Sequence, residues 1–245
     1  MSIALAAEWL ARARQVTVLT GAGVSAESGI PTFRGDGGYW RKLRVEELAT
    51  PAAFTRDPKL VWEWYEERRQ TVAQCAPNAG HRVLAAWEKR FPFFLLATQN
   101  VDGLHQAAGS VRVAPLHGDL WTLRCTAEGT ERIDRRTPLP AIPPRCPACG
   151  ALERPAIVWF GEPLPKEHWE EATQAAVVCD VLLVIGTSGV VQPAASLVDI
   201  ALAHHARVIE INLRETALSD VVSASLQGPA ATVLPALDRL LPPDT

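Results

Sequence analysis

The chain has 245 residues, of which 48% are hydrophobic and 21% are charged, and its formal net charge is −3. A folded chain of this length buries about 70–75% of the surface that its unfolded form exposes, so it is long enough for a core of its own. The composition excludes extended disorder and collagen-like repetition, and the charge provides no global attraction to nucleic acid or anionic lipid.

The first residues are predicted to form an amphipathic helix. Their apolar side chains recur at helical spacing, at Ile3, Ala6, Ala7, Leu10 and Ala13. Glu8 interrupts the apolar core that a secretory leader needs. The longest apolar stretch, 175–186, contains Asp180 and is shorter than the ~20 residues that span a bilayer. Because five cysteines are an odd number without disulfide-scaffold density, we expect a reducing compartment and a cytoplasmic protein.

Short β-branched segments alternate with helical segments along the chain. Strands are predicted at 16–20, 93–98, 157–160, 181–186 and 207–211. Helices are predicted at 59–73, 79–90, 166–178 and 194–204. The strands are almost continuously apolar, which is typical of parallel strands covered on both faces. This alternation predicts an α/β fold with a Rossmann-like, doubly wound parallel sheet.

Two insertions interrupt the alternation and predict a smaller lobe. Residues 35–77 are too many for an ordinary crossover and have helical character. Residues 123–154 are rich in proline and charge and hold three of the five cysteines. They have few large apolar residues, so we expect a bound metal ion or another cross-link to stabilise them. We expect one domain over 1–245, with its large part at 1–34, 78–122 and 155–245.

A glycine-rich turn follows the first predicted strand. Gly21, Gly23 and Ala26 form G-x-G-x-x-A between a strand and a helix start, where a dinucleotide pyrophosphate can approach the backbone. A tight turn without a ligand explains the glycines as well. The loop that follows carries Phe33, able to shield a ring, and Arg34, able to meet a phosphate.

Polar residues follow two later strands. Residues 99–102 stand where open α/β sheets bind ligands, although helix capping would explain Asn100 or Asp102 alone. His117 follows the strand-like run 111–114, and a buried histidine with structural partners is the alternative there.

Together these motifs resemble the signature motifs of the sirtuins, which are NAD-dependent protein lysine deacylases. The signature segments are 21–34, 98–102 and 117–118, and further matches follow in family order at 77–81, 158–162, 186–188 and 228–230. The resemblance extends from Val16 to about Leu240. It implies that NAD is consumed rather than reduced, so the acidic ribose contact of dehydrogenases is not required.

The resemblance implies a role for each matching residue. His117 would be the general base. NAD contacts would be Gly21, Ala22, Gly23, Ser25, Phe33, Arg34, Trp40, Gln99, Asn100, Val101, Asp102, Gly186, Thr187, Ser188, Asn212, Leu213, Arg214 and Ala230. An extended acyl-lysine peptide would add a strand to the segment formed by Val158, Trp159, Phe160, Gly161 and Glu162.

The resemblance also implies a zinc-ribbon-like insertion with two Cys-x-x-Cys pairs. Cys146 and Cys149 form one intact pair, and Cys125 begins the other. Glu128 replaces the fourth cysteine and can offer a carboxylate oxygen. We expect one Zn²⁺ per chain, held by Cys125, Cys146 and Cys149.

The predicted helix 59–73 places Tyr65 and Arg68 on one face. A solvated helix with Glu–Arg pairs is the plain alternative. In the class III sirtuins, which remove succinyl, malonyl and glutaryl groups, a matching Tyr-x-x-Arg pair binds the acyl carboxylate, and an alanine matching Ala49 widens the pocket. The resemblance therefore implies a desuccinylase and demalonylase that also removes acetyl groups.

We expect a monomeric enzyme that acts on acyl-lysine proteins, releases nicotinamide and O-acyl-ADP-ribose, and binds neither nucleic acid nor membrane. Mono-ADP-ribosyl transfer at the same NAD site is one alternative. A silent NAD-sensing or nucleic-acid-binding module is the other. The presence of His117, Asn100 and Asp102 argues against a silent module, and the net charge argues against nucleic acid.

Overall fold

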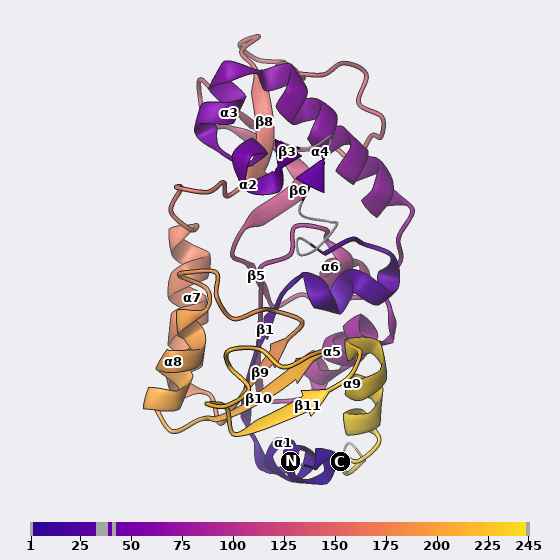
Figure 1. Ribbon diagram of the computed structural model, residues 1–245, viewed down its shortest axis with the longest axis vertical. Helices are drawn as coiled ribbons and strands as arrows, with labels where there is room; N and C mark the ends of the chain where they lie inside the picture. The colour runs from indigo at the N-terminus through magenta and orange to yellow at the C-terminus, as the bar shows by residue number, and fades with distance from the viewer. Residues whose placement is uncertain (1, 33–38, 41–42, 244–245) are drawn as a thin grey trace.

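A six-stranded parallel sheet forms the lower part of the computed structural model, which describes residues 2–32, 39–40 and 43–243 (Figure 1). The strand order is β11-β10-β9-β1-β4-β5. The strands are β1 (Gln15–Thr20), β4 (Phe93–Thr98), β5 (Val113–Pro115), β9 (Val181–Ile185), β10 (Arg207–Asn212) and β11 (Ala224–Gln227). This topology confirms the predicted Rossmann-like sheet.

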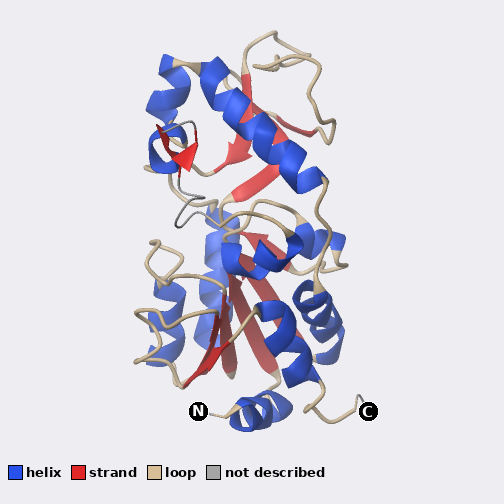
Figure 2. Cartoon of the chain, turned by 45° about the vertical axis from the view of Figure 1, so that its right-hand side comes forward, coloured by secondary structure: helices blue, strands red, loops and turns tan. Residues whose placement is uncertain are grey.

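Helices cover both faces of this sheet (Figure 2) because successive side chains of a strand point to opposite faces. Val16 and Val18 pack towards the layer formed by α1 (Ile3–Arg12), α5 (Ala79–Arg90) and α9 (Ala230–Asp238). Leu19, Leu182 and Val184 pack towards the layer formed by α7 (Lys166–Val178) and α8 (Ser196–Ala203). None of the helices in the described part of the chain is both long and apolar enough to cross a membrane.

An antiparallel sheet lies at the end of the molecule away from the termini (Figure 1). Its order is β7-β6-β8, with β6 (Gly118–Cys125), β7 (Glu131–Ile133) and β8 (Glu153–Ile157). Beside it lie α2 (Val45–Leu48), α3 (Pro51–Arg56), α4 (Pro58–Ala73) and the hairpin of β2 (Tyr39–Trp40) and β3 (Leu43–Arg44). Residues of both predicted insertions share one hydrophobic cluster, which contains Trp62, Leu139 and Trp159.

Arg69 joins α4 to the antiparallel sheet and the chain beyond it. Its buried guanidinium donates to the carbonyl oxygens of Leu120 at 2.7 Å, Asp134 at 2.5 Å and Arg136 at 2.9 Å. Glu66, on the same helix, lies 3.8 Å from the Arg69 Nε. Helix α4 is therefore held to two segments that are distant from it in sequence.

The strand predicted at 157–160 is wrong as a member of the parallel sheet. β8 ends at Ile157 and pairs antiparallel with β6. Beyond it the chain turns, because the backbone N–H of Trp159 donates to the Glu162 carboxylate at 2.8 Å and the N–H of Glu162 donates to the Trp159 carbonyl at 2.9 Å. Ile157 and Trp159 are buried in the hydrophobic cluster of the small lobe, whereas Phe160 is exposed. An apolar run alone does not say which sheet its residues will join.

Candidate active site

Most of the residues predicted to bind NAD lie at the carboxyl ends of the parallel strands. β1 leads into η1 (Ala22–Ser28) through Gly21, and β4 leads through Gln99–Asp102 to α6 (Leu104–Ala107). Gly186, Thr187 and Ser188 follow β9. Asn212 ends β10 and is followed by Leu213 and Arg214, and Ala230 begins α9 after β11. Phe33 and Arg34 lie outside the described residues, and Trp40 lies in β2.

Glycine is required at this edge by backbone contacts within the protein. A Cβ on Gly23 would lie 2.6 Å from the Gly186 Cα, and a Cβ on Gly21 would lie 2.9 Å from the Gly186 carbonyl oxygen. Gly186 has φ +60°, a region that favours glycine. Close packing of the turn accounts for the glycines, and it does not exclude a ligand, because two glycines beside Ala22 leave little side-chain bulk where a pyrophosphate would approach the backbone.

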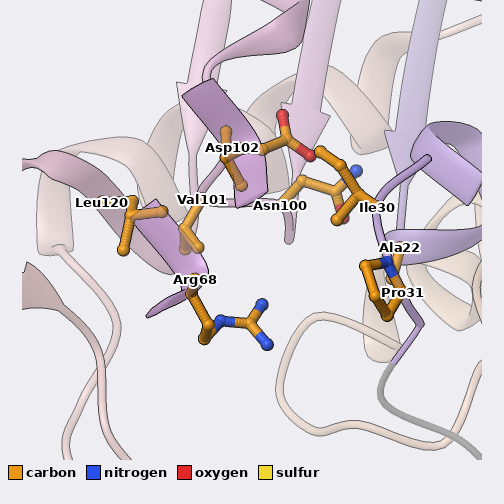
Figure 3. A pocket seen from close by; sticks show the side chains of 9 residues that line it. Ala22, Ile30, Pro31, Arg68, Asn100, Val101, Asp102 and Leu120 are labelled. Carbon is orange, nitrogen blue, oxygen red and sulfur yellow. The ribbon is translucent and has the colours of Figure 1, made fainter. Parts of the chain in front are cut away.

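A cavity opens beside this edge (Figure 3). It is lined by Ala22, Ile30, Pro31, Arg68, Val72, Asn100, Val101, Asp102 and Leu120. Arg68 extends its guanidinium from α4 into this space (Figure 3). Burial lowers the pKa of Arg68, and the charges of Tyr65 and Asp102 act in the opposite direction. The cavity thus combines apolar walls with one cation, one carboxyl group and one amide.

Asp102 and Asn100 are tied to the glycine turn. The Ser25 hydroxyl donates to the Asp102 carboxylate at 2.8 Å, and the Asn100 amide donates to the Gly21 carbonyl at 3.1 Å. Asp102 also accepts the backbone N–H of Leu104, the first residue of α6, at 2.8 Å. The N-cap of α6 is Gly103, which has no side-chain cap, so the helix-capping explanation does not apply to Asp102. Burial raises the pKa of Asp102, and these hydrogen bonds lower it. Asp102 therefore stabilises the turn that precedes α6 and also lines the cavity.

His117 is oriented by the backbone of Gln99. The His117 Nδ1 lies 3.0 Å from the Gln99 carbonyl oxygen. A carbonyl only accepts, so Nδ1 carries the proton and Nε2 keeps its lone pair. Burial lowers the pKa of His117, and the hydrogen bond to Gln99 raises it. The Gln99 side chain donates to the Thr187 hydroxyl at 3.0 Å, which links the histidine to the end of β9. A neutral imidazole in this arrangement can act as a base.

Tyr65 and Arg68 both lie on α4 but have different surroundings. Arg68 reaches the cavity, whereas Tyr65 is buried in the aromatic cluster and its hydroxyl accepts the Trp159 indole N–H at 2.7 Å. Burial raises the pKa of Tyr65, and the hydrogen bond from Trp159 and the charge of Arg68 lower it. The solvated-helix alternative is therefore wrong for Tyr65. Ala49 is buried, and its carbonyl accepts the backbone N–H of Phe160 at 2.9 Å.

Two buried histidines, His81 and His105, pack against each other next to the glycine turn. The sequence assigned neither of them a role. The His81 Nδ1 accepts the backbone N–H of Asn78 at 3.3 Å, so its Nε2 carries the proton and faces the Ser25 hydroxyl, also at 3.3 Å. The His105 Nε2 lies 3.0 Å from the Thr20 hydroxyl, and the two rings are 4.8 Å apart. Burial lowers the pKa of His81 to about 4 and that of His105 to about 3. His81 belongs to a matched motif, whereas nothing in the sequence marks His105.

These pKa values predict a loss of stability in mild acid. Both histidines take up a proton in the unfolded chain near pH 6.5 but resist it in the fold, so the free energy of unfolding should fall as pH drops from about 6.5 towards 4. The expected slope is about 1.4 kcal/mol per pH unit for each histidine. Urea unfolding at several pH values measures it. In His105→Gln, the free energy of unfolding should depend less steeply on pH, by about the contribution of one histidine. In His204→Gln, which replaces an exposed histidine, the slope should equal that of the wild type. Equal slopes in the two variants would contradict the prediction.

Cys125, Glu128, Cys146 and Cys149 form a cluster whose ligand atoms all lie within 4.8 Å of one another. Cys125 ends β6, and Cys146 and Cys149 precede β8. Three thiols and a carboxylate are a donor set that zinc accepts, so the residues present fit the ion. Bound zinc would join the two ends of the proline-rich segment 123–154.

Glu128 is expected to act as the fourth zinc ligand. Purified protein should contain about one zinc per chain, and Glu128→Ala should lose it to a chelator sooner, whereas Glu128→Cys should retain it longer. Elemental analysis after timed dialysis measures this. Glu131→Ala is the matched control, since Glu131 is an exposed acid on β7 that pairs with Arg124 at 2.7 Å. Equal zinc loss from Glu128→Ala and Glu131→Ala would exclude the carboxylate ligand.

The fold and site define a Rossmann-like domain with a cavity at the carboxyl edge of its sheet, and three comparisons identify its family. Residues 21–193 match the family model described as "Sir2 family". The NAD-dependent protein deacylase of Aquifex aeolicus is 52% identical over 219 residues, which are 89% of this chain and 92% of the relative. The solved structure of a Sir2 homologue–NAD complex matches with a TM-score of 0.92 at 45% identity, covering 96% of this chain and 92% of the other. A Sir2–p53 peptide–NAD⁺ structure matches with a TM-score of 0.86 at 31% identity, covering 98% of this chain and 97% of the other.

The chain therefore belongs to the Sir2 family, the sirtuins. The family resemblance predicted from the sequence is confirmed.

Proposed function

We propose that the chain is an NAD-dependent protein lysine deacylase that prefers acyl groups ending in a carboxylate and also removes acetyl groups. Family membership and relatives named NAD-dependent protein deacylase support the enzyme class, with NAD as co-substrate. One observation carries the acyl preference: the guanidinium of Arg68 enters a cavity whose other walls are largely apolar (Figure 3).

NAD lies along the carboxyl edge of the parallel sheet in this proposal. The glycine turn receives the pyrophosphate, and the residues after β9, β10 and β11 hold the adenosine half. Asn100 and Asp102 hold the nicotinamide ribose, which is supported by their place in the cavity. Phe33 would shield the reacting carbon from water. The acyl-lysine peptide runs along the segment from Val158 to Glu162.

His117 serves as the general base at its Nε2. The acyl oxygen attacks the anomeric carbon of the nicotinamide ribose, nicotinamide leaves, and a ribose hydroxyl must then lose its proton to continue the reaction. The Nδ1–H of His117 is held by the Gln99 carbonyl at 3.0 Å, which leaves the Nε2 lone pair to accept that proton. Water completes the release of lysine, and the acyl group departs on ADP-ribose.

Arg68 accounts for the preference for acidic acyl groups. A carboxylate that leaves water is costly to bury unless a cation meets it. The planar guanidinium can bind both carboxylate oxygens, and it already lies in the cavity. A methyl group gains nothing from this cation.

The decisive experiment compares acyl-lysine peptides of one sequence. Succinyl and butyryl groups have the same chain length and differ in the terminal carboxylate, so butyryl is the matched uncharged control. We expect kcat/KM to be higher for succinyl than for butyryl, with measurable acetyl removal and nicotinamide release in each case. Butyryl removal that equals or exceeds succinyl removal would overturn the acyl preference. Transfer of labelled ADP-ribose to the peptide without deacylation would favour the mono-ADP-ribosyltransferase alternative.

A cytoplasmic location is also proposed. It is supported by the five cysteines, all of which lie in the described part of the chain and none of which forms a disulfide. The monomeric state expected from the sequence stays a prediction.

A further inference from the structure

We propose that Glu210, a buried residue of β10, is a positioning residue for the adenosine half of NAD, because its carboxylate fixes the loop that follows this strand. This loop, the β10–β11 loop, comprises residues 213–223 and begins with two of the predicted cofactor contacts. The inference rests on the proposed placement of NAD and extends it to a residue behind the cofactor. The sequence motifs gave Glu210 no role.

Glu210 is a carboxylate buried in the parallel sheet. It is 1% exposed, and its strand lies between β9 and β11. Three hydroxyl groups donate to it: those of Thr216 and Ser219, in the β10–β11 loop, at 2.5 Å each, and that of Ser225, in β11, at 2.7 Å. A carboxylate that leaves water is costly unless its oxygens accept hydrogen bonds. The carboxylate and the loop therefore stabilise each other.

The two loop hydroxyls each form a second hydrogen bond within the loop. The Thr216 oxygen accepts the backbone N–H of Leu218 at 3.0 Å, and the Ser219 oxygen accepts the backbone N–H of Thr216 at 2.9 Å. A hydroxyl has one proton, and here it points to Glu210 because a carboxylate only accepts. Without the carboxylate these protons lose their acceptor, and the turn that the hydroxyls close loses its support.

The same loop is joined to the segment that follows β9. Leu218 is buried in the cluster on the α7–α8 face of the sheet, and a Cβ on Gly189 would lie 2.4 Å from its Cδ1. Asn212, the last residue of β10, donates from its side chain to the Thr187 carbonyl at 2.7 Å. Glu210 therefore fixes a loop that lies against both strand ends proposed to hold the adenosine half.

This effect of Glu210 is confined to one end of the cofactor. Thr216 lies two residues after Arg214, which is a predicted contact of the adenosine half. Asn100 and His117 follow β4 and β5, which β9 and β1 separate from β10 in the strand order. A loop that is already held loses little conformational freedom when a ligand binds. We therefore expect Glu210 to raise the affinity for NAD without affecting the chemical step.

The first test replaces Glu210 by Gln, which keeps the size of the side chain and removes its charge and one acceptor oxygen. The Kd of ADP-ribose, measured by calorimetry, and the KM of NAD should both rise about five- to thirtyfold. The kcat at saturating NAD and the KM of an acyl-lysine peptide should stay near the wild-type values. Asp220→Asn is the matched control, because Asp220 is an exposed carboxylate of the same loop, and it should bind ADP-ribose as the wild type does.

Two serines distinguish positioning of the loop from general support of the sheet. Ser219→Ala and Ser225→Ala each delete one hydroxyl that donates to the same oxygen of Glu210, Oε2. Ser219 belongs to the loop, whereas Ser225 belongs to β11. Ser219→Ala should weaken ADP-ribose binding about two- to tenfold, the effect of one hydrogen bond, and Ser225→Ala should leave it unchanged. If Glu210→Gln does not fold, this pair decides.

Three results would overturn the inference. One is unchanged ADP-ribose affinity in folded Glu210→Gln, and another is an equal loss of affinity in Ser219→Ala and Ser225→Ala. The third is a Glu210→Gln enzyme in which kcat and the KM values of both substrates worsen together, because Glu210 would then support only the fold.

The proposed placement of NAD is tested separately by Leu213→Ala/Arg214→Ala, which truncates two exposed side chains of the loop. Wild-type ADP-ribose affinity in this variant would defeat the placement itself. Weakened binding in this variant together with wild-type binding in Glu210→Gln would keep the placement and defeat only the role of Glu210.

Discussion

Replacing His117 by Ala is expected to lower the deacylation rate by about 10²–10⁴-fold without unfolding the protein. The imidazole is held by one hydrogen bond, from its Nδ1–H to the Gln99 carbonyl at 3.0 Å, so its removal costs the fold little. What is lost is the Nε2 lone pair and, with it, the acceptor for the ribose proton. Single-turnover rates with an acyl-lysine peptide, alongside thermal unfolding, measure both quantities.

The pH profile gives this prediction a second readout. The wild-type rate should fall in acid as His117 becomes protonated. The small residual rate of His117→Ala should not show this decrease at low pH. His204→Ala is the control, since His204 is exposed and lies after α8. A folded His117→Ala protein that works at the wild-type rate would remove the histidine from the mechanism.

Replacing Arg68 by Met is expected to lower kcat/KM for succinyl peptides about thirtyfold or more while acetyl peptides change little. The loss of one partner from a buried charged pair costs about 2–5 kcal/mol, and 2 kcal/mol corresponds to roughly thirtyfold. Methionine keeps most of the volume, so the cavity wall is preserved. Arg68→Lys should retain part of the preference, because it keeps the charge and loses the planar fork.

The adjacent Arg69 offers a contrasting variant. It lies on the same helix, but its guanidinium binds three backbone carbonyls and does not line the cavity. Arg69→Met should therefore destabilise the small lobe and reduce both substrates together. If Arg68→Met behaves in the same way, Arg68 has a structural role and the acidic-acyl proposal fails with it.

The fold of the large part was predictable because its signals are local. Continuous apolar runs identified β1, β4, β9 and β10, since strands covered on both faces need no polar side. The strand predicted at 157–160 was wrong because the side chains that bury Ile157 and Trp159, such as Phe54 and Tyr65, come from a distant part of the chain. β11 and α9 were not predicted. β11 is short, and α9 contains Pro235, which is unfavourable inside a helix.

The site was predictable by residue type but not by contact. Motif spacing located His117 and Asp102, yet the partners that orient them, Gln99 and Ser25, become visible only when the strand ends converge. Helical spacing placed Tyr65 near Arg68, but the indole that holds its hydroxyl is 94 residues away along the chain. His105 could not be found at all, because a buried pair with His81 leaves no periodic signal.

The anchoring of α4 by Arg69 has a consequence for how such enzymes diverge. Carbonyl oxygens accept hydrogen bonds whatever side chain their residue carries, so most substitutions at Asp134 and Arg136 leave these two bonds in place. Insertions or deletions between β7 and Leu139 are different, because they shift the carbonyls that hold the helix carrying Arg68. Changes of loop length far from the cofactor can therefore retune substrate choice while the reacting groups stay constant, and homologues with identical signature motifs need not share substrates.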